Sequence, residues 1–229
     1  MACTSVPDER MTSYVDFPET RELTSRTLTL DSALFRYPYR VRVQDDKAVV
    51  FDLHGTEYFF HAFHYPGFHY LSSFGKRGDA PEEMLSAENL RWNGSFLWTL
   101  DSNKSELTRL GFASSGDSLL RLETVSLDEE QLRALDFVQY DDSTFIIPDY
   151  SGDGRFCLVS RQGRLLRKIG TIPTTNEDAL KNARPALAQA WRSFIDYNPR
   201  NGVLAAVTQL GEVLEIYNLT VSYTHLPSP

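Results

Sequence analysis

Asp149, Ser151 and Asp153 have the residue types and the spacing of a calcium loop. They occupy the first, third and fifth positions of an EF-hand-like pattern, within Asp149-Tyr-Ser-Gly-Asp-Gly154. The twelfth position of such a loop needs a bidentate glutamate, and this chain has Ser160 there. We therefore predict a hairpin turn at this loop and no calcium site.

A second group with the chemistry of a metal site is a cluster of four histidines. Its members are His54, His61, His64 and His69. Imidazoles are common zinc ligands, but residues 61 and 64 of one strand face opposite sides of a sheet. Aromatic packing with polar tips is the role that we predict for these side chains, and we expect no metal.

Catalytic signatures are not found in the remaining sequence. It has no Gly-x-Ser-x-Gly elbow, no phosphate-binding loop and no dinucleotide fingerprint. Acidic residues are plentiful, but they recur at positions typical of turns. The sequence therefore predicts no catalytic residue and no cofactor.

The elements that position these residues form a repeat of about fifty residues. Three segments align, and they span residues 39–78, 88–126 and 136–173. Their second predicted strands are AVVFDL, SFLWTLD and TFIIPDY, and each ends near an aspartate: Asp52, Asp101 and Asp149. These aspartates lie 49 and 48 residues apart. A fourth unit, residues 193–220, supplies three further strands.

Short apolar strands bounded by turn residues are typical of antiparallel β structure. Asp45-Asp46, Asn93-Gly94, Asp141-Asp142 and Asn201-Gly202 each fall between a first and a second strand. Four strands per unit at this period predict an all-β fold, a β-propeller with about four blades. A β-sandwich, the alternative, requires no such repeat. We assign residues 26–220 to this partial propeller and residues 1–25 to a polar tether.

One helical insertion interrupts the repeat at residues 174–192. Apolar residues recur there at helical spacing, after an Asn/Thr cap region and acidic residues. Pro185 is expected to kink or divide this helix. We expect the insertion to lie on one end of the propeller, where it covers or lines the axial channel.

The segment YLSSFGKRGDAPEEML, residues 70–85, connects the first two units. Tyr70–Phe74 reads as the outermost strand of the first blade, and residues 75–80 as the crossing. Pro81-Glu82-Glu83 suits the first turn of a short helix. The crossing resembles the F-G-x-x-G-x-G-P-G-E-F pattern of NHL-type repeats, although Asp79-Ala80 replaces Gly-Pro.

With its repeat length, the chain resembles the TolB-like six-bladed propellers, envelope lipoproteins of Gram-negative bacteria, over residues 27–220. The resemblance implies six blades, so we expect the four units to be a fragment. The tail at residues 221–229 resembles translated adapter sequence, which supports that expectation. A complete four-bladed ring, closed by a strand at residues 26–30, is the alternative.

The two cysteines suggest different roles. Cys157 lies in the apolar run FCLVS and is predicted to be a small buried hydrophobic residue. Cys3 follows Ala2 and precedes a polar segment, which resembles the acylated junction of a bacterial lipoprotein. On this interpretation Cys3 is lipidated and the signal peptide is incomplete. The alternative is an ordinary cytoplasmic start.

Net charge limits the classes of partner. The formal charge of −8 disfavours nucleic acid and anionic membrane surfaces, and the basic residues at 161, 164, 167 and 168 read as a solvated face. We therefore predict a non-catalytic binding or scaffold module of the cell envelope, periplasmic or anchored to the outer membrane by lipid. Its partner would be an unidentified protein, peptide or glycan. The alternative is a propeller enzyme, an NHL-type lyase or hydrolase with its site in the axial channel.

Overall fold

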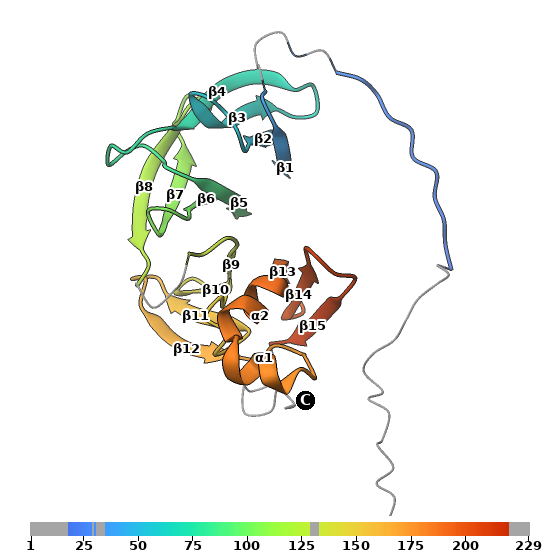
Figure 1. The fold of residues 1–229 in the computed structure, drawn as a ribbon. Coiled ribbons are helices and arrows are strands. Elements are labelled where there is room, and N and C mark those ends of the chain that lie inside the picture. The colour runs from blue at the N-terminus through green and yellow to red at the C-terminus, as the bar shows by residue number, and fades with distance from the viewer. Residues whose placement is uncertain (1–17, 29, 31–34, 129–132, 220–229) are drawn as a thin grey trace, which may run out of the picture.

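The computed structural model describes residues 18–28, 30, 35–128 and 133–219. Within these ranges, four antiparallel sheets are arranged around a common axis (Figure 1). The prediction of an all-β propeller is confirmed. Two predicted features lie outside the described residues, namely Cys3 and the tail at residues 221–229.

Each sheet is a blade whose strands follow one another in chain order from the axis outward. Blade 1 contains β1 (Pro38–Gln44), β2 (Lys47–Asp52), β3 (Tyr58–His64) and β4 (His69–Lys76). Blade 2 contains β5 (Ala87–Asn93), β6 (Phe96–Asp101), β7 (Glu106–Phe112) and β8 (Leu119–Ser126). Blade 3 contains β9 (Val138–Gln139), β10 (Thr144–Pro148), β11 (Phe156–Ser160) and β12 (Leu165–Ile169). Blade 4 contains β13 (Ser193–Asn198), β14 (Val203–Thr208) and β15 (Leu214–Asn218).

The second strands of blades 2 and 3, β6 and β10, are mostly apolar because both of their faces are buried between neighbouring blades. In β10, Phe145 and Ile147 pack toward blade 2, whereas Ile146 packs toward blade 4. Successive side chains of a strand point to opposite faces, so a strand between two neighbours has no polar face. Burying one such side chain contributes roughly 1.5–3 kcal/mol, and this packing holds the blades together.

The crossing from blade 1 to blade 2 requires a glycine. Gly75 has a φ of 65°, and a Cβ atom there would lie 2.7 Å from the Phe60 ring. The short helix predicted at residues 81–83 is wrong. Its first turn is present, but the Met84 N–H donates to the Lys76 carbonyl at 2.8 Å and returns the chain to a strand-like bridge.

The insertion forms two short helices, α1 (Glu177–Asn182) and α2 (Arg184–Ala190). The Asn176 side chain accepts a hydrogen bond from Ala179 N at 3.0 Å and caps α1. Pro185 lies in the first turn of α2, so the proline divides the segment as expected. Among the described residues, neither helix has the length and apolarity to cross a membrane.

The two end blades leave apolar side chains exposed. In the described part of the chain β15 pairs with β14 alone, and Leu214 and Ile216 are each 60% exposed. Residues 26–28 and 30 form no strand, so the ring closure considered for residues 26–30 is not observed. Leu30 instead packs against the face of blade 1 that is turned away from blade 2.

Candidate functional site

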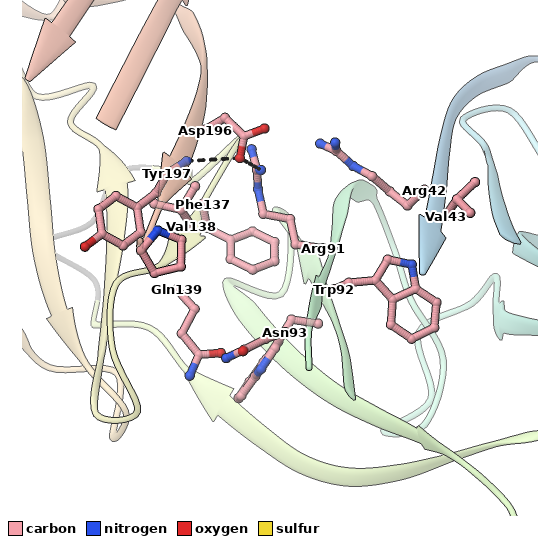
Figure 2. A pocket seen from close by; sticks show the side chains of 12 residues that line it. Arg42, Val43, Arg91, Trp92, Asn93, Phe137, Val138, Gln139, Asp196 and Tyr197 are labelled. Carbon is pink, nitrogen blue, oxygen red and sulfur yellow. Dashed lines mark hydrogen bonds and ion pairs between the residues drawn. The ribbon is translucent and has the colours of Figure 1, made fainter. Parts of the chain in front are cut away.

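The innermost strands of the four blades bring charged side chains to the axis. Two cavities of about 270 and 220 Å³ lie there, and they share Arg42, Arg91 and Asp196. We call them together the axial cavity, and Figure 2 shows the larger of the two. Its charged lining residues are Arg40, Arg42, Arg91, Asp136 and Asp196.

Asp136, just before β9, joins three blades. Its buried carboxylate accepts the backbone N–H of Ile195 at 2.9 Å and that of Phe137 at 2.8 Å. It also accepts a hydrogen bond from the Nδ2 atom of Asn89 in blade 2. Arg91 Nη2, also from blade 2, donates to it at 3.2 Å. A buried carboxylate with this many donors is fully satisfied, and it ties blades 2, 3 and 4 together.

Arg91 connects the buried aspartate to an exposed one. Its guanidinium pairs with Asp136 and, at 3.0 Å through Nη1, with Asp196 of β13. It also donates to the Ile195 carbonyl. The Asp196 side chain is 70% exposed, so this second pair lies at the mouth of the cavity.

Blade 1 joins this network through Arg40. Its guanidinium donates to Asn89 Oδ1, and it lies 5.2 Å from the ring centroid of Phe194 on blade 4. A chain of hydrogen bonds therefore runs from β1 through Asn89 and Asp136 to β13. Blades 1 and 4 approach each other at this point.

Arg42, two residues along β1, is placed differently. It is half-buried, and its Nε atom is buried without a hydrogen-bond partner. Figure 2 shows its side chain extending from β1 toward Arg91 and Asp196. Burial lowers the pKa of Arg42, and the positive charges of Arg91 and Arg40 lower it further.

Comparison with known proteins places the chain in a family. The family model described as TolB-like 6-blade propeller-like matches residues 16–226, most of the chain. The chain belongs to this TolB-like family. The resemblance to this family, drawn from the repeat length, is therefore confirmed. No curated protein sequence matches the chain.

Solved structures similar to this TolB-like propeller differ widely in sequence. A functionally unknown Desulfotomaculum acetoxidans protein has a TM-score of 0.51 at 12% identity, over 80% of this chain and 52% of that one. A DUF4221 family member from Bacteroides vulgatus scores 0.49 at 11% identity, over 86% and 63%. A streptogramin B lyase scores 0.47 at 12% identity, over 82% and 56%. The chain thus spans about half to two thirds of these proteins, and the first likeness supports the fold alone.

The three repeated aspartates of the TolB-like propeller are buried, away from the axial cavity. Asp52 accepts the N–H groups of Arg36 and Tyr37 at 2.7 and 2.6 Å. Asp101 accepts those of Leu85 and Ser86 in the same way, at 2.7 and 3.2 Å. Both carboxylates therefore fix the entry of the chain into the innermost strand of their own blade.

Asp149 has the same position in the repeat but another role. It accepts the N–H groups of Ser151 and Gly154, both at 2.9 Å, and so closes the predicted turn. The Lys168 ammonium lies 3.3 Å from Asp149 and from Asp153, and 2.6 Å from Ser151 Oγ. A lysine cation thus lies among the three residues of the calcium-like pattern.

His64 and His69 lie opposite each other on β3 and β4, whereas His54 and His61 pack against separate aromatic rings. The His54 ring packs at 5.2 Å from Tyr37, and His61 meets Phe35 edge-on at 5.3 Å while its Nδ1 bonds Ser73 Oγ. His64 lies beside Asp46 on the surface. Within the described ranges, no three His, Cys, Asp or Glu side chains form a group that could hold a metal.

The remaining predicted residues also have structural surroundings. Cys157 is buried as predicted, and burial raises the pKa of its thiol to about 12. Arg161 contacts Glu123 of blade 2 at 2.6 Å, so this part of the basic segment is an inter-blade ion pair instead of a simple solvated face.

Sequence reasoning missed the axial residues. The insertion packs on the turn at residues 149–154, and the expectation that it lines the axial channel is not met. No residue of 174–192 is among those that line the axial cavity; Arg184 instead pairs with Asp153 of blade 3. A usable signal was present in YRVRVQ, residues 39–44, where arginines alternate with apolar residues on a first strand. The first strand of each repeat is the one nearest to the axis of a propeller.

Proposed function

We propose that this TolB-like propeller is a non-catalytic ligand-binding module whose ligand occupies the axial cavity. One observation supports this most strongly: charged side chains on, or just before, the innermost strands of four blades converge there. Aromatic rings line the same space, from Trp92, Phe137 and Tyr197. Concave sites that combine apolar surface with a few convergent polar groups are typical of small-molecule binding.

The hydrogen bonds and ion pairs that the acidic groups already make favour binding over acid–base catalysis. The Asp136 carboxylate is buried and already accepts four different groups, so it has little capacity to take a proton from a substrate. Asp196 is paired with Arg91 at an exposed position. A lyase or hydrolase in this channel would need a less committed base.

For localisation, we propose the bacterial cell envelope. The support comes from the family and from Cys3, whose surroundings in the sequence resemble a lipoprotein junction. In this proposal lipid at Cys3 is the only attachment to the membrane. Metabolic labelling with a fatty-acid analogue tests it, with residues 3–229 expressed directly after a complete lipoprotein signal peptide. Loss of the label in Cys3→Ser is the expected result, and an unlabelled wild-type chain would contradict it.

A cavity-filling variant tests the binding proposal. Val43 lines the cavity and is 44% exposed, so Val43→Trp should fill the space without disturbing the core. Val41 lies two residues earlier on β1, is 49% exposed and does not line the cavity, so Val41→Trp is the matched control. A panel of sugars, amino acids, organic acids and short peptides would be screened by thermal shift and calorimetry.

We expect ligands that bind the wild type and Val41→Trp but not Val43→Trp. Equal binding by all three proteins would place the ligand elsewhere and contradict the proposal. Conversion of a bound compound into a product, followed by NMR, would instead support the enzyme alternative.

A further inference from the structure

We infer that the ligand of the axial cavity is a small acid whose carboxylate or phosphate group binds the guanidinium of Arg42. This inference rests on the proposed function, because it takes the axial cavity to be the binding site. It adds the chemical class of the ligand and the residue that selects it.

The first support is the pairing of the charges around the cavity. Both aspartates are engaged by Arg91, at 3.2 Å for Asp136 and 3.0 Å for Asp196. Arg40 is engaged by the amide oxygen of Asn89. Among the described residues, Arg42 alone of the three lining arginines has neither a hydrogen bond nor an ion pair from its guanidinium. The cavity therefore has one more cation than it has anions.

The second support is the energetic state of Arg42. A half-buried cation beside two other guanidinium groups loses hydration and gains repulsion, and both effects lower its pKa. The opposite charge of a bound anion would offset both effects. Arginine suits this role, because its planar fork of donors matches carboxylate and phosphate oxygens in a bidentate geometry.

Two other unpaired atoms extend the pattern beyond Arg42. Trp92 Nε1 and Arg91 Nε are buried without hydrogen-bond partners, and both residues line the larger cavity. Both atoms are donors, so they favour a ligand rich in acceptor oxygens. Gln139 Oε1 is one unpaired acceptor at the same cavity, and it suits a hydroxyl group. The volume of about 270 Å³ limits the part of the ligand held there to a small molecule.

Citrate and inorganic phosphate are suitable probes, because they separate the two anion chemistries. Each would be titrated into the folded protein by calorimetry at low ionic strength, with triethyl citrate as the neutral counterpart. We expect at least one anion to bind and the ester not to bind. Arg42→Gln should weaken the binding by about tenfold or more, the loss typical of one charge-assisted hydrogen bond.

Two further variants make the test specific. Arg164, exposed beside the outermost strand of blade 3, provides the matched control, since Arg164→Gln removes the same charge away from the axis. Arg164→Gln should leave the affinity unchanged. Asp196→Asn should increase the affinity, because it removes a negative charge from the mouth of the cavity.

Three results would overturn the inference. They are failure of both anions to bind at millimolar concentration, equal losses in Arg42→Gln and Arg164→Gln, and binding of the ester as tightly as citrate. If a neutral ligand from the panel is excluded by Val43→Trp but is unaffected by Arg42→Gln, the inference fails while the proposed function stands. If the anions bind and Val43→Trp does not exclude them, the binding site itself is wrong.

Discussion

The repeated aspartates and the axial cavity are two polar regions of one propeller. The aspartates recur from blade to blade, whereas the residues of the cavity do not. Asp52 and Asp101 occupy the same position in consecutive blades and hold the same two backbone groups, 16 and 15 residues earlier. The axial residues come from equivalent innermost strands, yet they differ in kind from blade to blade: arginines on β1, Asn89 and Arg91 on β5, Asp136 before β9 and Asp196 on β13.

This contrast separates structural from specific roles. A residue that each blade needs for its own chain path recurs with the repeat, so a recurring carboxylate is a poor candidate for chemistry. At the axis the blades meet one another instead, and each contributes a different part to one network. Polar residues that break the repeat on innermost strands are therefore the better candidates for ligand contact.

The largest effect should follow the loss of Asp136. Asp136→Ala removes the acceptor that joins three blades and leaves the Arg91 guanidinium, whose side chain is 11% exposed, with one partner fewer. Breaking a buried pair in this way costs about 3 to 5 kcal/mol of unfolding free energy. Urea denaturation followed by fluorescence measures it.

Asp196→Ala is the matched control on the same network. Its carboxylate contacts the same arginine but is 70% exposed, so the expected cost is at most about 1 kcal/mol. Equal losses of unfolding free energy in Asp136→Ala and Asp196→Ala would show that the buried and the exposed ends of the network contribute equally to stability.

A smaller loss is expected at the repeated position in blade 2. Asp101→Ala leaves the Leu85 and Ser86 N–H groups without their acceptor, as well as those of Asn103 and Lys104. We expect a loss of about 2 to 3 kcal/mol by urea denaturation, since water reaches part of this segment and satisfies some of the donors. Asp101→Asn keeps one acceptor oxygen and should lose less. A variant as stable as the wild type would mean that the recurring aspartate has no structural role.

The sequence was sufficient for the regular part of this structure. The strand order, the blade limits and the turn at residues 149–154 follow from recurring apolar runs and turn residues, which local physics determines. The axial set could not be predicted in the same way. Arg91 meets Asp196 across 105 residues, and that distance closes only when blades 2 and 4 are placed around one axis. The short helix at residues 81–83 failed for a similar reason, since Lys76 and Met84 pair across the crossing.

A modest pH effect is expected from the histidine group. Burial lowers the pKa of His61, so the unfolded chain, with an ordinary value near 6.5, binds the proton more readily. The stability that the neutral, buried His61 contributes is fully present above pH 6.5, and it is lost as the pH falls through the pKa of the folded state. The imidazole is partly exposed, and screening should keep the loss below about 1 kcal/mol.

The measurement compares the wild type with His61→Gln between pH 7.5 and 5. The difference in unfolding free energy between the two proteins should shrink as the pH falls. This difference isolates His61, because the acidic groups of the two proteins are the same. A difference that stays constant over this range would show that His61 does not titrate as its burial requires.

No effect at all is expected from calcium or zinc, although the loop at residues 149–154 carries the calcium-like pattern. The Lys168 ammonium lies within 3.3 Å of Asp149 and Asp153, and Arg184 holds the other oxygen of Asp153 at 3.1 Å. A divalent ion would have to displace a lysine that already balances these charges, and Ser160 cannot provide the two oxygens of the usual glutamate. Adding either metal to the purified chain should therefore leave its melting temperature unchanged and give no heat of binding. Lys168→Met is the second variant to titrate with calcium, because it removes the competing cation and leaves the carboxylates in place. A wild type that binds calcium stoichiometrically at micromolar concentration would show that the recurring aspartates can carry chemistry after all, and that the regularity of a position does not exclude function.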